Sequence, residues 1–236
     1  MKNLVIFLLC CSVIAPAHAG SDAELTHSLR CVKLFHKNER IYNIPGDALY
    51  SISLRESGRK HSTKDVTMPW PWTANVEGKG YHFDSKSEAV YFVKQQLMQG
   101  KESIDVGCMQ VNLKYHPHAF NSVEEAFDPK ANIAYSASFL RSKYEQLGSW
   151  HKAIAHYHSA TPELGNPYKE SVIKIARNID KYKKAFKKHP RYPDDRRIAE
   201  VYSSPPRRQS QDFVAKSRRY KSDMMVHVPV RQVPRT

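Results

Sequence analysis

Glu56 is the residue of this chain whose surroundings best suit acid–base chemistry. It lies near the end of the stretch 47–58, in which apolar residues recur at the spacing of one helix face, and it falls on that same face. A carboxyl group turned toward a core loses hydration, so its pKa rises and it can donate a proton near neutral pH. The alternative is a solvated glutamate at a frayed helix end, beside Arg55 and Arg59.

Three later stretches carry side chains that could bind a ligand near such an acid. Residues 107–110 read Gly-Cys-Met-Gln, with Asn112 close behind, residues 153–158 read Ala-Ile-Ala-His-Tyr-His, and residues 166–168 read Asn-Pro-Tyr. Each stretch has a structural alternative. A buried Met or Tyr usually belongs to the core, and Gln or Asn can satisfy backbone groups at a turn.

Helices must position these side chains. The stretch 47–58 is predicted to be a short helix. Pro45 and Gly46 are helix-breaking residues just before it, and Gly58 can end the helix. The last helix is expected to follow a break in the chain at Pro162, Gly165 and Pro167, and the polar segment 59–66 is expected to be loop. Helical spacing of apolar residues predicts the other helices at 22–42, 86–98, 122–127, 130–147, 150–158 and 167–186.

The segment 67–83 has a different pattern and is predicted to form a short hairpin around the Gly-Lys-Gly sequence at 78–80. Its prolines are expected to keep Trp70 and Trp72 at the edge of that hairpin. An exposed indole can stack on the apolar face of a sugar ring, whereas a buried indole packs the hairpin against the domain. We expect stacking for Trp70 and packing for Trp72.

Charge and the N-terminus narrow the class of partner. The net charge of +14 and the pI near 9.6 predict attraction to nucleic acid, an anionic membrane surface or an acidic wall polymer. The N-terminus is typical of a secretory signal peptide. It has a basic start, an apolar run over 4–15 and a cleavage site of small residues that ends at Ala19. We therefore expect residues 1–19 to be removed on export, which makes nucleic acid an unsuitable partner.

Two cysteines remain after the expected cleavage, Cys31 and Cys108. An even pair in an exported protein is typical of a disulfide, and two buried thiols are the alternative. Neither cysteine has a second ligand at zinc-like spacing, and the histidines show no His-Glu-x-x-His pattern. We expect no metal and no cofactor.

Residues 187–236 differ in composition from the rest of the chain. They hold thirteen Lys or Arg against five Asp or Glu, several prolines and few large aliphatic residues. This composition predicts a disordered basic tail. The chain is thus expected to comprise a signal peptide (1–19), a folded domain (20–186) and the tail (187–236).

The order and spacing of four stretches resemble the catalytic domain of lytic transglycosylases of the soluble (Slt) type, relatives of goose-type lysozyme that cleave peptidoglycan. The resemblance spans roughly residues 26–182 and implies a mainly helical α+β, lysozyme-like fold with a small β-hairpin beside the cleft. The stretches that carry it are Glu56-Ser57-Gly58, Gly107-Cys108-Met109-Gln110, Ala153-Ile154-Ala155-His156-Tyr157-His158 and Asn166-Pro167-Tyr168.

The resemblance assigns a role to each matching residue. Glu56 matches the family's single catalytic acid and base. Tyr157 matches the tyrosine whose hydroxyl points at that glutamate, and His158 stands where the family most often has Asn. A neutral imidazole offers a donor and an acceptor as Asn does, so binding should survive with added pH sensitivity. The other residues expected to bind substrate are Ser57, Met109, Gln110, Asn112 and Tyr168, with Trp70 beside them.

The implied activity is cleavage of the β-1,4 bond between MurNAc and GlcNAc without water, which leaves a 1,6-anhydro-MurNAc end. Most glycosidases use two carboxylates, whereas this mechanism needs only Glu56. A hydrolytic lysozyme would need a second carboxylate, and the candidates by position are Asp65, Glu77, Asp84 and Asp105.

The other alternative is a non-catalytic peptidoglycan-binding module of a secretion or conjugation system. In either case the signal peptide predicts a periplasmic location, and we expect a monomer whose partner is the glycan strand. The basic tail offers a site for a cell-envelope complex of that kind.

Overall fold

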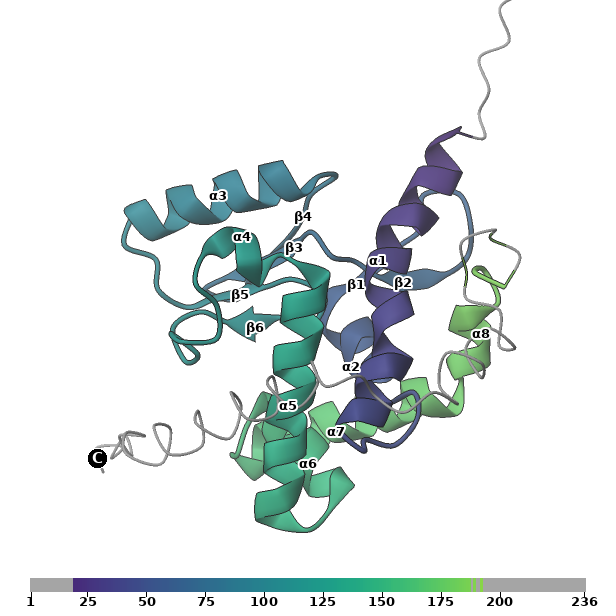
Figure 1. The fold of residues 1–236 in the computed structure, drawn as a ribbon, viewed down its shortest axis with the longest axis vertical. Coiled ribbons are helices and arrows are strands. Elements are labelled where there is room, and N and C mark those ends of the chain that lie inside the picture. The colour runs from purple at the N-terminus through teal and green to yellow at the C-terminus, as the bar shows by residue number, and fades with distance from the viewer. Residues whose placement is uncertain (1–18, 188, 190–191, 193–236) are drawn as a thin grey trace, which may run out of the picture.

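Helices make up most of the protein, and a four-stranded antiparallel sheet lies on one side of them (Figure 1). The computed structural model describes residues 19–187, 189 and 192. The helices are α1 (Ala19–Ile41), α2 (Ala48–Ser57), α3 (Lys86–Met98), α4 (Val123–Ala126), α5 (Pro129–Leu147), α6 (Trp150–His158), α7 (Pro162–Arg177) and α8 (Ile179–Lys183). The strands are β1 (Gly58–Lys60), β2 (Thr67–Pro69), β3 (Thr73–Val76), β4 (Lys79–His82), β5 (Ile104–Val106) and β6 (Val111–Asn112). The predicted fold class, mainly helical α+β, is confirmed.

The short helix α2 is the central element. Eight of its ten residues are buried, so only Arg55 and Glu56 reach the surface. Helices α1 and α7 and strand β2 pack around it. Asp47, just before α2, is in the left-handed conformation and its side chain does not cap the helix. The cap comes from α1 instead, because Glu39 Oε1 accepts the N–H of Leu49 at 2.9 Å.

The predicted hairpin is part of a larger sheet with the strand order β4-β3-β5-β6. Its turn consists of Glu77 and Gly78, both with positive φ, which is the geometry of a two-residue hairpin turn. The turn thus begins earlier than the predicted Gly-Lys-Gly sequence, and Gly80 lies inside β4. A second small sheet pairs β1 with β2, so part of the segment predicted as loop is strand. Three-residue strands are too short to show an alternating pattern in the sequence.

Alternation along the strands gives the main sheet two different faces. Ala74, Val106 and Val111 are register partners on three neighbouring strands, and all three are buried. The next row across the same strands, on the opposite face, is polar and half-buried, and it consists of Asn75, Asp105 and Asn112.

The boundary predicted for the last helix is wrong. Helix α7 begins at Pro162, passes through Pro167 and ends at Arg177, and α8 follows it. Pro162 occupies the first helical position, where a missing N–H costs nothing. At Gly165 an added Cβ would lie 2.6 Å from the Ser159 carbonyl oxygen, so α7 packs very closely on the end of α6. Tertiary packing therefore keeps this Pro- and Gly-containing segment helical.

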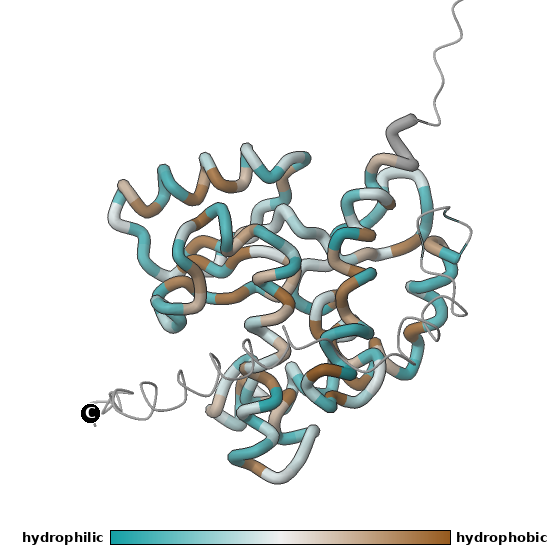
Figure 2. The backbone as a smooth tube through the Cα atoms, in the orientation of Figure 1, coloured by the Kyte–Doolittle hydropathy of each residue, from teal (hydrophilic) through white to brown (hydrophobic). Residues whose placement is uncertain are grey.

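One hydrophobic core joins the helices to the sheet. In Figure 2, hydrophobic positions recur along the outer helices between hydrophilic ones, as expected for helices with one buried side. Within the described part of the chain, every helix is too short or too polar to cross a membrane. The predicted signal peptide, apart from Ala19, lies outside the described residues, as does the predicted tail except for three positions.

Candidate active site

Glu56 lies on the last turn of α2 and is half-buried. Burial is the largest cause that raises its pKa, to about 7, and the negative charge of Asp105 adds to the rise. The Tyr168 hydroxyl and the Arg55 guanidinium act in the opposite direction. A carboxyl group in this state can both donate and accept a proton near neutral pH.

Tyr168, His158 and Arg55 form a layered group beside Glu56. Tyr168 is buried on α7, and burial raises the pKa of its hydroxyl well above the ordinary value. The exposed His158 ring stacks on the Tyr168 ring, with 4.7 Å between the centroids and 9° between the planes. The Arg55 guanidinium carbon lies 5.7 Å from the centroid of the same ring. Two of the predicted residues, His158 and Tyr168, therefore do gather near Glu56.

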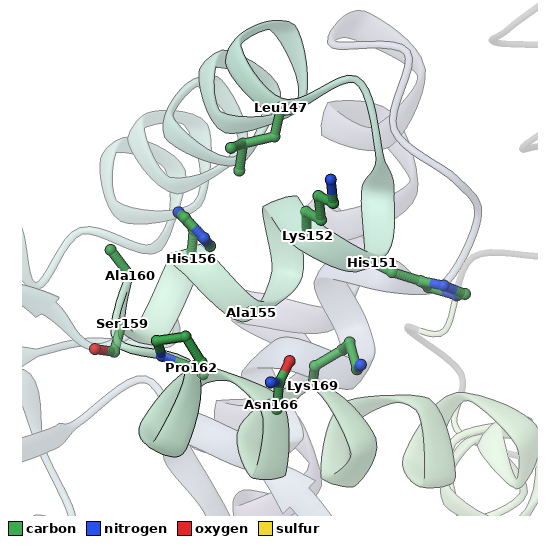
Figure 3. A pocket seen from close by; sticks show the side chains of 11 residues that line it. Leu147, His151, Lys152, Ala155, His156, Ser159, Ala160, Pro162, Asn166 and Lys169 are labelled. Carbon is green, nitrogen blue, oxygen red and sulfur yellow. The ribbon is translucent and has the colours of Figure 1, made fainter.

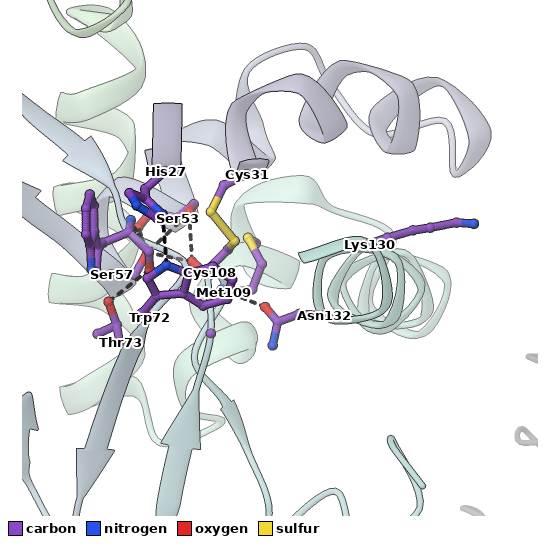
Figure 4. The surroundings of a disulfide bond; sticks show 12 residues. His27, Cys31, Ser53, Ser57, Trp72, Thr73, Cys108, Met109, Lys130 and Asn132 are labelled. Carbon is purple, nitrogen blue, oxygen red and sulfur yellow. Dashed lines mark hydrogen bonds between the residues drawn. A yellow bond between two sulfur atoms is a disulfide. The ribbon is translucent and has the colours of Figure 1, made fainter. Parts of the chain in front are cut away.

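The carbonyl oxygen of Cys108 holds the C-terminal half of α2 (Figure 4). The hydroxyls of Ser53 and Ser57 each donate a hydrogen bond to it at 2.7 Å. Ser57 Oγ also accepts the N–H of Trp70 at 3.3 Å. Because Ser57 is only 1% exposed, the expected contact between this residue and the substrate is wrong. Ser57 instead fixes the helix that carries Glu56.

A disulfide ties the same turn to α1, as Figure 4 shows. It joins Cys31 to Cys108, with 6.1 Å between the Cα atoms, so the structure contains the predicted bridge. The two cysteines are 77 positions apart, and closing a loop of that length stabilises a fold by about 4 kcal/mol. The bridge therefore helps hold the turn against α2.

Asn132 of α5 completes the hydrogen bonding of the turn. Its Nδ2 donates to the carbonyl oxygens of Val106 and Ala126 at 2.9 and 3.0 Å, and its Oδ1 accepts the N–H of Met109 at 2.9 Å. Gly107 has a φ of +83°, and an added Cβ there would lie 2.5 Å from Asn132 Nδ2. Both observations restrict position 107 to glycine.

Met109 and Tyr157 meet through the backbone of the turn. The Met109 side chain is fully buried, so the expectation that it lines the cleft is wrong, and it belongs to the core. The Tyr157 hydroxyl donates to the Met109 carbonyl oxygen at 2.8 Å. Its hydrogen-bond partner is therefore this carbonyl, and the contact with Glu56 that the resemblance implied stays a prediction. Burial and then the nearby charge of Glu56 raise the pKa of Tyr157.

Gln110 and Asn112 also brace the turn. Gln110 has a φ of 47°, and its Nε2 donates to the carbonyl oxygens of Thr73 and Gly107 at 3.0 and 3.1 Å. Asn112 Nδ2 donates to Asp105 Oδ1 at 2.8 Å. The structure thus gives these amides the bracing role that was the alternative, and contact of their half-buried side chains with substrate stays a prediction.

Trp70 is buried, with 1% of its surface exposed, so the expected stacking on a sugar ring is wrong. Its Nε1 donates to the Phe83 carbonyl oxygen at 2.7 Å, and the Arg59 guanidinium carbon lies 4.3 Å from its ring centroid. Trp72 is buried as expected, and its Nε1 donates to His27 Nδ1 at 3.1 Å. Both indoles pack the segment before β3 against the domain.

Three residues of this region were missed or not singled out by the sequence. Asn132 is a polar residue on the inward face of a helix, which is the signal that would have found it. Ser53 lies one helical turn before Ser57 on the same face. Asp105, whose negative charge acts on Glu56, was only one of four candidate carboxylates.

A pocket lies between α6 and α7 (Figure 3). Its lining includes none of the predicted site residues, and its charged or titratable side chains are His151, Lys152, His156 and Lys169.

Comparison with known proteins supplies the family. The profile of the family described as "Transglycosylase SLT domain" matches residues 33–179, well over half of the chain. No curated protein and no solved structure shows a significant match. The matched span contains α2, the turn at 107–112, α6 and α7. An SLT domain implies binding of peptidoglycan and cleavage of its glycan strands. The chain therefore belongs to the SLT transglycosylase family.

Proposed function

We propose that the protein is a lytic transglycosylase that cleaves the β-1,4 bond between MurNAc and GlcNAc and leaves a 1,6-anhydro-MurNAc end. The observation that carries this proposal is the state of Glu56. A half-buried carboxyl group with a pKa of about 7 ends the buried helix at the surface, inside the span that matches the family. Such a group can serve as acid and base in turn.

The reaction needs one proton carrier and no protein nucleophile. Protonated Glu56 gives its proton to the glycosidic oxygen, the bond from that oxygen to C1 of MurNAc breaks, and GlcNAc leaves with a free 4-hydroxyl. The N-acetyl group of MurNAc stabilises the positive charge at C1. Ionised Glu56 then takes the proton of the C6 hydroxyl while that oxygen closes on C1, so the acid form is restored.

The layered group beside Glu56 supports this use of a single residue. The buried Tyr168 hydroxyl keeps its proton, so it can donate a hydrogen bond to the ionised carboxyl group or to substrate. The turn at 107–112 and the two serines fix α2 without using Glu56. The carboxyl group is thereby left free for chemistry.

The test is digestion of purified sacculi followed by mass spectrometry of the products. We expect anhydro-muropeptides from the natural protein and a loss of about a thousandfold in rate for Glu56→Gln, the range that acid–base catalysis supplies. Glu163→Gln makes the same chemical change at an exposed position of α7 and should keep full activity. Undiminished activity of Glu56→Gln would remove this residue from the mechanism.

The products also separate the other functions. Reducing ends in place of anhydro ends would identify a hydrolytic muramidase. Binding to sacculi without cleavage by the natural protein would identify a peptidoglycan-binding module.

We further propose that the protein acts in the periplasm after removal of residues 1–19, and that the basic segment 187–236 binds the wall or a secretion or conjugation complex. The supporting observations are the composition of the N-terminus and the excess of Lys and Arg in the C-terminal segment. N-terminal sequencing of exported protein tests the first point. Sacculus binding and partner pull-down by a chain truncated after residue 186 test the second.

A further inference from the structure

The pocket between α6 and α7 is lined by basic side chains, and the described residues add no acidic one to its lining (Figure 3). His151, Lys152 and His156 come from α6, and Lys169 comes from α7. The cavity volume of about 330 Å³ is in the range of sites that hold a small ligand. A cavity with this lining attracts an anion.

Protein carboxylates neutralise little of this positive charge. In the described part of the chain, Lys152 and His156 take part in no ion pair. Lys169 pairs with Glu170 at 2.9 Å, and the Glu170 side chain is 67% exposed. The charge of Glu170 also interacts with His151. Because an ion pair with so exposed a carboxylate contributes little to stability, a carboxylate of a ligand can replace it.

The floor of the pocket is small and apolar. Ala155 and Gly165 are buried, and an added Cβ at Gly165 would lie 3.0 Å from the Ala155 carbonyl oxygen, so the two helices are in close contact there. Ser159 and Asn166 add a hydroxyl and an amide that can form hydrogen bonds. The remaining lining residues are Leu147, Ala160 and Pro162. An apolar floor beneath a basic rim suits a short peptide of alanine and acidic residues.

The pocket begins next to the layered group beside Glu56. Its lining residues Ser159 and Lys169 directly follow His158 and Tyr168 in the chain. The rings of His158 and Tyr168 stack with 4.7 Å between their centroids. Since successive Cα atoms are about 3.8 Å apart, the pocket and the layered group border the same contact between α6 and α7.

We propose that this pocket binds the carboxylates of a peptidoglycan stem peptide, so that the protein prefers glycan strands that carry peptides. The proposal deepens the proposed function and rests on it for the identity of the polymer. A stem peptide consists of alanine, glutamate, a diamino acid and a second alanine, and it is attached to MurNAc. Its methyl groups match the small apolar floor, and its carboxylates match Lys152 and Lys169 at the rim.

The reach and the charge of the ligand agree with this assignment. Four extended residues span about 13 Å, so a peptide on a MurNAc at Glu56 is long enough to pass the stacked rings of His158 and Tyr168. The chain's own segment 187–236 has an excess of Lys and Arg, so it lacks the charge that this pocket attracts.

The direct test is binding of a free, N-acetylated stem tetrapeptide to the full natural chain, measured by calorimetry. We expect Lys152→Gln combined with Lys169→Gln to weaken binding about tenfold, the size expected for the loss of two exposed charge pairs. Lys130→Gln combined with Lys174→Gln removes the same charge at exposed positions of α5 and α7 outside the pocket, and it should bind like the natural chain. Equal losses in the two double variants would overturn the proposal, because only the net charge would then matter.

The choice of ligand separates a peptide site from a general anion site. The same peptide with its carboxyl groups amidated should bind at least about tenfold more weakly, since it keeps the methyl groups and loses the charge. Amidated peptide that binds as tightly as the free acid would overturn the proposal. Acetate or inorganic phosphate that binds as tightly as the peptide would also overturn it, because the apolar floor would then contribute nothing.

A second measurement uses the natural chain and so does not depend on the folding of a variant. Addition of the tetrapeptide should shift the backbone NMR signals of Ala155, Ser159 and Lys169, and shifts confined to other parts of the chain would overturn the proposal. On the polymer, the ratio of cleavage rates for peptide-bearing strands and for strands stripped of peptides should fall in the Lys152 and Lys169 double variant.

The same experiments distinguish failure of this proposal from failure of the proposed function. If sacculi release anhydro products but the tetrapeptide does not bind, the pocket assignment fails alone. If the tetrapeptide binds in the pocket but sacculi release no product, the proposed function fails, and the pocket is the peptide site of a binding module.

Discussion

The two ends of α2 each involve a carboxyl group whose pKa is raised to about 7, yet the two groups do different things. Glu39 of α1 meets the first turn, is 2% exposed and accepts the backbone N–H of Leu49. Glu56 ends the helix, is half-buried and lies beside Tyr168 and Arg55. A raised pKa alone therefore does not identify a catalytic residue. Exposure and the neighbouring groups separate the structural carboxyl from the one available to substrate.

The two ends are also held differently. At the N-terminal end a single carboxyl group supplies the cap. At the C-terminal end two serine hydroxyls, the Cys108 carbonyl, a disulfide and Asn132 hold the helix and its turn. Glu56 is not needed for the fold, so a change there should affect activity with little effect on stability. Changes in the groups that hold α2 should instead lower stability, and they lower activity where the position of α2 is disturbed.

The largest loss of stability is expected for Asn132→Ala. Three backbone groups of the turn and its surroundings lose their buried partner, and leaving such groups unpaired costs about 4 kcal/mol in total. Urea denaturation measures the loss, and sacculus digestion should fall with it because the turn holds α2. Gln99→Ala, at an exposed position outside the candidate site, is the control. Equal stability of the two variants would show that this turn is not what holds the C-terminal end.

Glu39→Ala should lower the free energy of unfolding by about 3 kcal/mol, because the buried N–H of Leu49 loses its acceptor and α2 loses its cap. The products released from sacculi should still be anhydro-muropeptides when digestion is measured well below the melting temperature. Glu163→Ala removes an exposed carboxyl group and serves as the comparison. If Glu39→Ala released products with reducing ends in place of anhydro ends, Glu39 would affect the chemistry. That result would contradict its purely structural role at the start of α2.

Gly107→Ala should destabilise the protein by about 2 kcal/mol more than Gly100→Ala. Both glycines have positive φ, +83° and +80°, but an added Cβ meets Asn132 only at position 107. The difference between the two variants therefore isolates the steric contact from the cost of the backbone conformation. Thermal or urea unfolding of the pair measures it, and identical losses would exclude the contact with Asn132.

The last expected effect is a change in the pH dependence of stability. The pKa values of Glu39 and Glu56 are near 7 in the folded protein and near 4.5 when unfolded. Their contribution to stability is therefore fully present below about pH 4.5 and is lost as the pH rises to 7. Glu39→Gln and Glu56→Gln should each flatten this fall between pH 5 and 8. Variants whose stability falls between pH 5 and 8 as steeply as that of the natural protein would contradict both assignments.

The sequence predicted the elements better than the roles of the side chains. Helices with clear periodicity, α2 and α5 among them, were found within a few residues, and Ser85 caps α3 as its type suggests. The start of α7 was missed because Pro162, Gly165 and Pro167 are read as breaks, whereas packing on α6 keeps the segment helical. Local sequence carries no information on such a long-range contact.

The sequence predicted which residues lie near one another in the candidate site. It did not predict which of them are buried and which can contact substrate. Ser57, Met109 and Trp70 were expected to touch substrate and are buried, because a motif shows that residues lie together but not which of them faces the cleft. Tyr168 and His158 do lie beside Glu56. Asp105 stayed one of four candidate carboxylates, since local sequence does not show that β5 lies between β3 and β6.

The most direct test of the central claim is the titration of Glu56 in the folded protein by carbon-13 NMR. Glu39→Gln removes the other carboxyl group expected to titrate in the same range, so the remaining signal can be assigned to Glu56. We predict a midpoint near 7. A midpoint near the ordinary value of 4.5 would contradict the account, because Glu56 would then be ionised at neutral pH and unable to begin the reaction as an acid.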